Sequence, residues 1–390
     1  MGIITPYTVA AGEWTPKLAE LRDRIISGLG RLGGGLPVPL QQEFAKTLEI
    51  VNSYYSNKME GNPTRIGDIF SAKQGQFAAT LTERNYQLEH LAHIKTTALM
   101  RDMLRKDPSL SPTRVEFFRL LHREFYQALP ESMRTATLVS GETVPIVPGE
   151  LRKLHVSVGH HHAVPVEQLE GSLDEFERAY DMKAFSSQDA LNALAAAHHR
   201  FLWIHPFADG NGRVVRLMTE AMAIRMGYEG HDLYSISRGL ARRRADYDAK
   251  LAAADAVRWN DLDGRGNLSL KGLIEFSEFF LDVMADQVEF MSKCMNPPDL
   301  QSRFGRFLNV LRVEKTLSSS ECLVLTHLLR LGEMRRGEIQ SVAGVERRQA
   351  SKIASHLLKL DYVQSQSVKG PLRLKATRDI VRALFPAFFE

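Results

Sequence analysis

Apolar residues recur every three or four positions along most of this chain, and that spacing predicts a protein built mainly of α-helices. One segment, Leu138–Val158, instead alternates apolar and polar residues around prolines, which predicts a short extended hairpin. No apolar run approaches the roughly 18 residues that a membrane-spanning helix needs. The predicted helices are Pro16–Leu29, Pro39–Tyr55, Leu81–Leu104, Ser111–Gln127, Val166–Tyr180, Ser187–Trp203, 213–227, 240–254 and Leu268–Cys294.

The C-terminal end differs from the rest of the chain in its charge. Residues 301–390 contain 16 Lys and Arg against 8 Asp and Glu, whereas the first 300 residues contain 34 against 38. A basic segment next to a nearly neutral body suggests a separate module that meets an anion such as nucleic acid. The sequence Asn296-Pro297-Pro298-Asp299 interrupts the helical pattern and is the predicted linker to that module.

The same segment predicts three helices followed by a hairpin, the order of a winged helix-turn-helix domain. DNA binding and a protein-contact role both stay open for it. The predicted helices are Ser318–Leu331, Arg336–Val342 and Glu346–Leu360, and the predicted strands are Tyr362–Gln366 and Leu372–Ala376.

Cysteine usage is sparse. Cys294 and Cys322 are the only two cysteines, so there is no disulfide framework and a cytoplasmic location is expected.

Twelve consecutive residues, His205 to Arg216, carry the strongest chemical signal: HPFADGNGRVVR. Pro206 ends the preceding helix and leaves the ring of His205 free to project. Glycines at 210 and 212 permit a tight turn whose N–H groups, with the start of the next helix, form an anion site. Asp209 offers a hard oxygen ligand for Mg²⁺, and the arginines at 213 and 216 can grip phosphate.

This stretch resembles the signature of the Fic-domain family, HPFx(D/E)GNGRxxR, and matches it at every position. Members are helical proteins that use ATP and Mg²⁺ to transfer AMP to a hydroxyl group of a target protein. The resemblance implies that His205 is the catalytic base and that Asp209 holds Mg²⁺. It also implies that Gly210, Asn211 and Gly212 cradle phosphate, and that Arg213 and Arg216 hold the β- and γ-phosphates.

Other segments extend the resemblance over roughly residues 40–290. Pro148–Arg152 together with Val156, Ser157, Val158 and Gly159 is similar to the flap hairpin that holds the target in register, and the last four residues are expected at the nucleotide. Tyr247 and Asp255 match loosely the positions of residues that contact adenosine. Three domains are therefore expected: N-terminal helices over 1–110, a Fic core over 111–295 and the winged helix over 300–390.

A second element, Ser56-Asn57-Lys58-Met59-Glu60-Gly61, matches the inhibitory motif of the family, (S/T)xxxE(G/N). The resemblance implies that Glu60 pairs with Arg216 and so occupies the group that should hold the γ-phosphate. In some relatives the same glutamate positions a water that removes AMP from the modified target.

The sequence thus predicts a self-inhibited protein adenylyltransferase with ATP as substrate, Mg²⁺ as cofactor and a hydroxyl-bearing protein, itself included, as target. Two alternatives stay open: a de-AMPylating hydrolase that uses Glu60, and a DNA-binding regulator in which the Fic portion senses nucleotide. A homodimer is a further open expectation, and a membrane partner is not expected.

Overall fold

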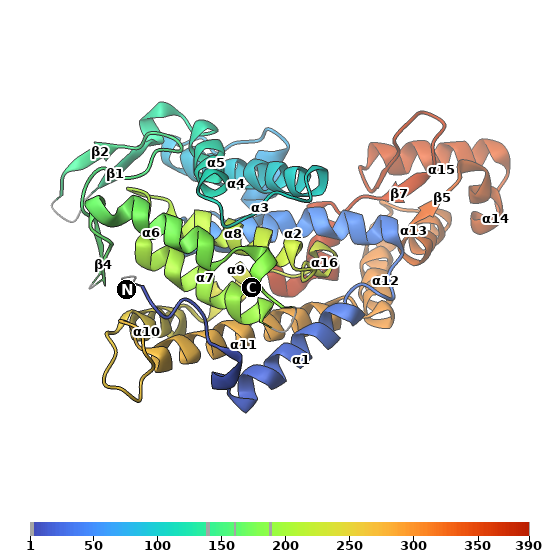
Figure 1. Cartoon of the computed structure of the whole chain (residues 1–390). Coiled ribbons are helices and arrows are strands. Elements are labelled where there is room, and N and C mark those ends of the chain that lie inside the picture. The colour runs from blue at the N-terminus through green and yellow to red at the C-terminus, as the bar shows by residue number, and fades with distance from the viewer. Residues whose placement is uncertain (1–3, 138–140, 160, 187–188, 390) are drawn as a thin grey trace.

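Helices account for most of the computed structural model, which describes residues 4–137, 141–159, 161–186 and 189–389 (Figure 1). The mainly helical fold predicted from the sequence is therefore confirmed. In the N-terminal and central parts the helices are α1 (Pro16–Arg31), α2 (Val38–Met59), α3 (Ile66–Lys73), α4 (Leu81–Lys106), α5 (Val115–Gln127), α6 (Val166–Ala179), α7 (Ala190–Ile204), α8 (Asn211–Arg225), α9 (Ile236–Arg242), α10 (Arg244–Asp255) and α11 (Leu270–Cys294).

Helix starts follow local capping chemistry where a cap is present. Thr15 accepts a hydrogen bond from the backbone of Leu18 at the start of α1, and Ser269 accepts one from Gly272 at the start of α11. Helix α5 begins four residues later than Ser111, because the buried hydroxyl of Thr113 instead donates to the carbonyl of Tyr180 at 3.0 Å. Tertiary contact therefore overrides the local start signal there.

The long helix α11 organises the core. It packs against α1, α7, α9 and α10, and Figure 1 shows α1 and α11 lying side by side although they are far apart in sequence. Phe276 and Phe280 on α11 and Phe201 on α7 are fully buried between these helices. None of the helices in the described ranges has an apolar stretch long enough to cross a membrane.

Two short antiparallel hairpins replace the single hairpin predicted over Leu138–Val158, whose first residues, 138–140, lie outside the described part. Strand β1 (Thr135–Thr137) pairs with β2 (Thr143–Pro145), and β3 (Ser157–Val158) pairs with β4 (His161–His162). Residues Pro148–Arg152, which resemble part of the flap, precede the β3–β4 hairpin. Gly149 has φ 81° and Glu150 donates to the carbonyl of Val147, so this segment is a turn.

The C-terminal part contains the helices and the hairpin predicted for it, while its assignment as a winged helix and its boundary at residue 300 stay predictions. Strand β7 lies between β5 and β6 in a small antiparallel sheet. The predicted linker is a short turn, because Asn296 caps a helix that begins at Pro297. The elements are α12 (Pro297–Val313), α13 (Ser319–Leu331), β5 (Glu333–Met334), α14 (Ile339–Ala343), α15 (Arg347–Lys359), β6 (Val363–Gln364), β7 (Leu372–Leu374) and α16 (Arg378–Leu384).

The C-terminal part returns to the N-terminal half of α2. Phe385 packs edge-on against Phe44 with ring centroids 5.0 Å apart. The buried carboxylate of Glu43 accepts hydrogen bonds from the amide of Gln364 at 2.7 Å and from the backbone of Ala376 at 2.9 Å. The first half of α2 therefore contacts the C-terminal part, and the last residue of α2 lies beside the candidate site.

Candidate active site

His205 ends helix α7 in the left-handed conformation, with φ 54°. Its backbone N–H still donates to Phe201, and Pro206 prevents the helix from continuing. Nδ1 lies 3.3 Å from the carbonyl of Leu202, which places the ring proton on Nδ1 and leaves the lone pair on Nε2. Burial lowers the pKa of His205 to about 4, so the imidazole is neutral at pH 7 and can accept a proton.

A buried arginine that the sequence did not single out as a site residue holds this loop in place. Arg152 is 4% exposed, and its guanidinium donates to the backbone carbonyls of His205 at 2.8 Å and Ile204 at 3.3 Å, and to that of Val164 just before α6. The backbone N–H of Arg152 also donates to Pro206 at 2.9 Å. The turn before β3 is thereby fastened to the candidate catalytic loop.

Asn211 braces the loop that follows. Its Oδ1 accepts from the N–H of Phe207 at 2.9 Å and its Nδ2 donates to the carbonyl of Phe207 at 2.8 Å. The side chain, predicted to cradle phosphate, is 2% exposed and is used within the loop. Gly210 has φ 80° and lies against Tyr126, where a Cβ would come within 2.9 Å of the tyrosine ring. Glycine is therefore required at this position, and the turn delivers the N-terminal end of α8 to the site.

Asp209 is charged and oriented by two donors. Its Oδ2 accepts from the hydroxyl of Tyr126 at 2.5 Å and from Nη2 of Arg213 at 3.2 Å. Burial raises the pKa of the Asp209 carboxyl, but Arg213 and the Tyr126 bond lower it more, so the net pKa lies below its usual range.

An anionic carboxylate at a helix N-terminus beside an arginine fits a Mg²⁺ ion that also binds phosphate oxygens. No cluster of three or more His, Cys, Asp or Glu that could hold a metal ion occurs in the described ranges.

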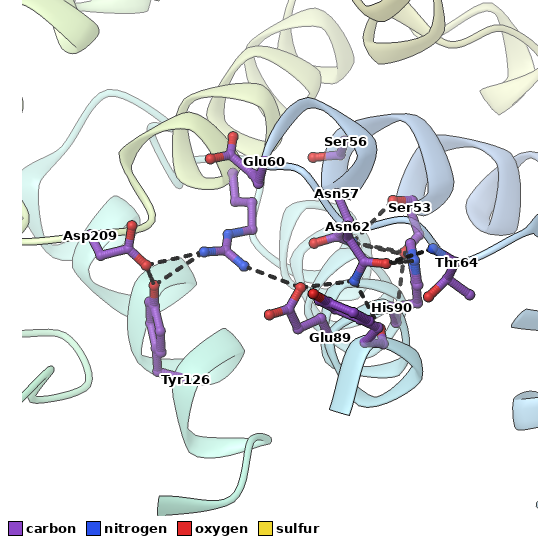
Figure 2. A network of polar contacts seen from close by, with 12 residues as sticks. Ser53, Ser56, Asn57, Glu60, Asn62, Thr64, Glu89, His90, Tyr126 and Asp209 are labelled. Atoms are coloured by element: carbon purple, nitrogen blue, oxygen red, sulfur yellow. Dashed lines mark hydrogen bonds and ion pairs between the residues drawn. The ribbon is translucent and has the colours of Figure 1, made fainter. Parts of the chain in front are cut away.

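Arg213 is buried under an aromatic ring and between carboxylates. Its guanidinium carbon lies 4.7 Å from the ring centroid of Phe125, and Nη1 lies 3.8 Å from Oε2 of Glu89. In Figure 2, Asp209 and Tyr126 lie on one side and Glu89 on the other, and dashed lines from both sides meet at the guanidinium between them. The sequence did not identify Glu89, because it lies on α4 and far from the motif in the chain.

The pairing of Glu60 with Arg216 is present. Oε1 of Glu60, the residue that ends α2, lies 2.6 Å from Nη2 of Arg216. Ser56 accepts twice from the same guanidinium, through Oγ and through its carbonyl, each at 2.9 Å. A Cβ at Gly212 would overlap Oε1 of Glu60, so the carboxylate rests directly on the first turn of α8. It occupies the place where the sequence predicts phosphate.

A pocket of about 710 Å³ opens beside His205. Val158 and Gly159 of the β3–β4 hairpin line it, as expected for flap residues, and Val156 and Ser157 adjoin them in the chain. Asp255 at the end of α10 also lines the pocket. Its carboxylate accepts from His199 at 3.0 Å and from His161 at 3.3 Å, and although burial raises its pKa, these bonds lower it to about 2.

Tyr247 lies elsewhere. It is 3% exposed on the inner face of α10, and its hydroxyl is 2.8 Å from Nε2 of His198. In this structure its ring packs near Phe276 in the core, so the predicted contact with adenosine would require α10 to move. The match to the family was loose over this stretch, and in the structure Tyr247 belongs to the buried face of α10.

Comparison with known proteins finds protein adenylyltransferases among the relatives of this chain. A 90-residue stretch is 39% identical to the protein adenylyltransferase Fic of Drosophila ananassae, covering 23% of this chain and 18% of that protein. A 236-residue stretch is 25% identical to the protein adenylyltransferase Fic of Nematostella vectensis, covering 57% of this chain and 49% of that one. The chain thus spans less than half the length of these curated relatives.

Two solved structures share the fold. A Fic family protein from Desulfovibrio desulfuricans G20 matches with a TM-score of 0.56 at 17% identity, covering 93% of this chain and 96% of that chain. Fic-1 from C. elegans matches with a TM-score of 0.52 at 17% identity, covering 72% of each chain. The model of the Fic/DOC family matches residues 112–223, which include the whole of the His205–Arg216 motif. Residues 112–223 of this chain therefore match the Fic/DOC family, and that match does not extend to the N-terminal helices or to the C-terminal part.

Proposed function

We propose that this chain is a self-inhibited protein adenylyltransferase that transfers AMP from ATP to a hydroxyl side chain of a protein. The observation that carries the proposal is a neutral His205 at the mouth of a pocket, next to a helix N-terminus with a charged Asp209 and two buried arginines. The names of the curated relatives support the same activity.

In the proposed reaction, Nε2 of His205 takes the proton of the target hydroxyl as its oxygen attacks the α-phosphorus of ATP. A new P–O bond to the target forms, the bond between the α-phosphorus and its bridging oxygen breaks, and pyrophosphate leaves. The α8 N-terminus and Arg213 stabilise the charge on the phosphates, which supplies most of the catalysis in such transfers. Mg²⁺, when bound at Asp209, would neutralise further phosphate charge.

The hydrolase alternative has a specific observation in its favour. Glu60 is anionic, because Arg216 and Arg213 lower its pKa further than burial raises it, and its carboxylate lies at the phosphate site. A carboxylate in that position could orient a water toward a phosphorus atom. Replacing Glu60 should raise AMP transfer if Glu60 is inhibitory, and should abolish AMP removal if Glu60 positions a water.

Transfer can be tested with ATP labelled at the α-phosphate, cell lysate and the Glu60→Gly chain. Label should appear on protein, and ATP labelled at the γ-phosphate should leave none. The variant that also carries His205→Ala should bind ATP but incorporate no label, because the base acts on the hydroxyl and general-base loss costs about 10²–10⁴ in rate. Absence of label with Glu60→Gly, or equal label without His205, would defeat the proposal. Mass spectrometry of the labelled bands names the targets.

The cellular location is also an inference. Cys294 and Cys322 are free thiols, which supports a reducing compartment such as the cytoplasm.

A further inference from the structure

Two carboxylates face the two arginines of the motif. Glu60 contacts Arg216 at 2.6 Å, and Glu89 lies 3.8 Å from Arg213. The side chains of both arginines are less than a tenth exposed, so their charges are shielded from water and depend on these partners. The arrangement places one anionic group at each guanidinium that should otherwise hold a phosphate.

Asn62 contacts Glu89 through its side chain and belongs to the turn that follows Glu60. Its Nδ2 donates to Oε2 of Glu89 at 2.9 Å and to the carbonyl of Tyr86 at 3.0 Å. Its Oδ1 accepts from the backbone of Thr64 at 3.0 Å and lies 3.2 Å from Nε2 of His90. The side chain is 4% exposed, and Figure 2 shows it between Glu89 and His90 at the end of α2. Each polar atom of its amide is thus engaged twice.

These contacts fasten the turn that carries Glu60. Glu60 ends α2, and Gly61 follows it with φ 86°, a left-handed conformation that glycine adopts without strain. The backbone of Asn62 donates to Asn57 at 3.1 Å, and His90 reaches back toward Asn57 and Ser53 through Nδ1. Through its side chain Asn62 therefore ties this turn to α4.

We propose that Asn62 is the positioning residue that holds Glu60 against Arg216, and that Glu89 is a second inhibitory carboxylate, acting on Arg213. The proposal rests on the adenylyltransferase function. Before ATP can be held productively, both carboxylates must give way to phosphate oxygens. Asn62 fixes the Glu60 turn and donates to Glu89, while each carboxylate acts on its own arginine.

The first test replaces Asn62 by Ala, with Thr64→Ala as the matched control, because Asn62 uses only the backbone N–H of Thr64. Removal of the amide should speed hydrogen exchange at Glu60 and Gly61 and raise the initial rate of AMP transfer on the order of tenfold. In the Glu60→Gly background the same change should add nothing to the rate, since Asn62 acts through Glu60. Thr64→Ala should leave exchange and rate at the wild-type values.

Exchange at Glu60 and Gly61 that is no faster in Asn62→Ala than in wild type overturns the positioning role, whatever the activity. A gain of equal size with and without Glu60 also overturns it. If Glu60→Gly itself transfers no AMP, the adenylyltransferase proposal fails, and the exchange measurement still decides the positioning role. The two failures are therefore distinguishable.

The second test concerns Glu89. Glu89→Gln keeps an acceptor for Asn62 but removes the charge, so titration calorimetry should show ATP bound severalfold more tightly, and the gain should persist in the Glu60→Gly background. Glu83→Gln on the same helix is the control for net charge. The Glu83 carboxylate is exposed and accepts a hydrogen bond from Thr80, the N-cap of α4. ATP affinity unchanged by Glu89→Gln, or raised equally by Glu83→Gln, would remove Glu89 from the inhibitory set.

Discussion

Replacing Glu60 tests the inhibitory contact directly, and the structure sets the size of the effect. Oε1 of Glu60 and Nη2 of Arg216 are 2.6 Å apart, and the arginine is 7% exposed. A hydrogen bond between charged groups in such a place contributes about 1.5–3 kcal/mol, or about 10- to 100-fold in an equilibrium. Glu60→Gly should therefore raise the initial rate of AMP transfer by about that factor. The two hydrogen bonds that Arg216 donates to Ser56 should keep the guanidinium in position for the γ-phosphate after the Glu60 carboxylate is removed.

The assay is the initial rate of α-phosphate incorporation into unmodified target at saturating ATP. Glu60→Gln, which keeps the shape but loses the charge, should give an intermediate gain. Adding Arg216→Ala to Glu60→Gly should abolish the gain, because the released group is the one removed. Equal initial rates for wild type and Glu60→Gly would refute the reasoning, as would a gain that survives Arg216→Ala. A hydrolase would instead retain the wild-type transfer rate and lose the ability to clear a target that already carries AMP.

Further expectations follow from individual residues. Because burial lowers the pKa of His205 to about 4, the base form of the free enzyme is present throughout pH 5–8, and kcat/KM for MgATP should show no acid limb near 6.5; a limb there would contradict the assignment. Asp209→Asn should reduce transfer to near zero at every Mg²⁺ concentration, and a fully active variant would exclude the metal role. Arg152→Ala should lower the free energy of unfolding in urea by about 2–4 kcal/mol, since it leaves buried carbonyls without donors, whereas Lys153→Ala beside it should change little. The full chain should bind duplex DNA through Arg347, Arg348 and Lys352 with an affinity that falls steeply as salt rises, and the triple alanine variant should lose this binding; no band shift at low salt would indicate a protein-contact module.

The helices could be predicted from sequence because an apolar stripe with helical spacing is a local property. Predicted and observed ends agree within a few residues for α1, α6 and α11. The prediction failed where a distant contact intervened, as at Ser111, where Thr113 bonds to Tyr180 and delays the start of α5. It also failed over Leu138–Val158, where two short hairpins stand in place of the single one that was predicted.

The site was only partly predictable. His205, Asp209, Arg213 and Arg216 lie within one loop and the first two turns of one helix, so the sequence alone brings them together. Tyr247 was chosen by a loose match to the adenosine-contacting residues of the family, and the structure buries it. Asn211 was expected to meet phosphate, yet its amide closes the loop instead.

Sequence by itself determined the parts of this protein whose geometry depends on neighbouring residues. Pro206 and Gly210 dictate the turn between two helices, and Gly212 lies in the first turn of α8, whose N–H groups point into the site. The tertiary structure decided what faces that turn. Glu60 and Arg216 are 156 positions apart, and Tyr126 and Asp209 are 83 apart, so these contacts exist only because helices α2 and α5 pack beside α8. The tertiary structure also decided the protonation states, because burial and the charges that packing brings close together set the pKa of each group.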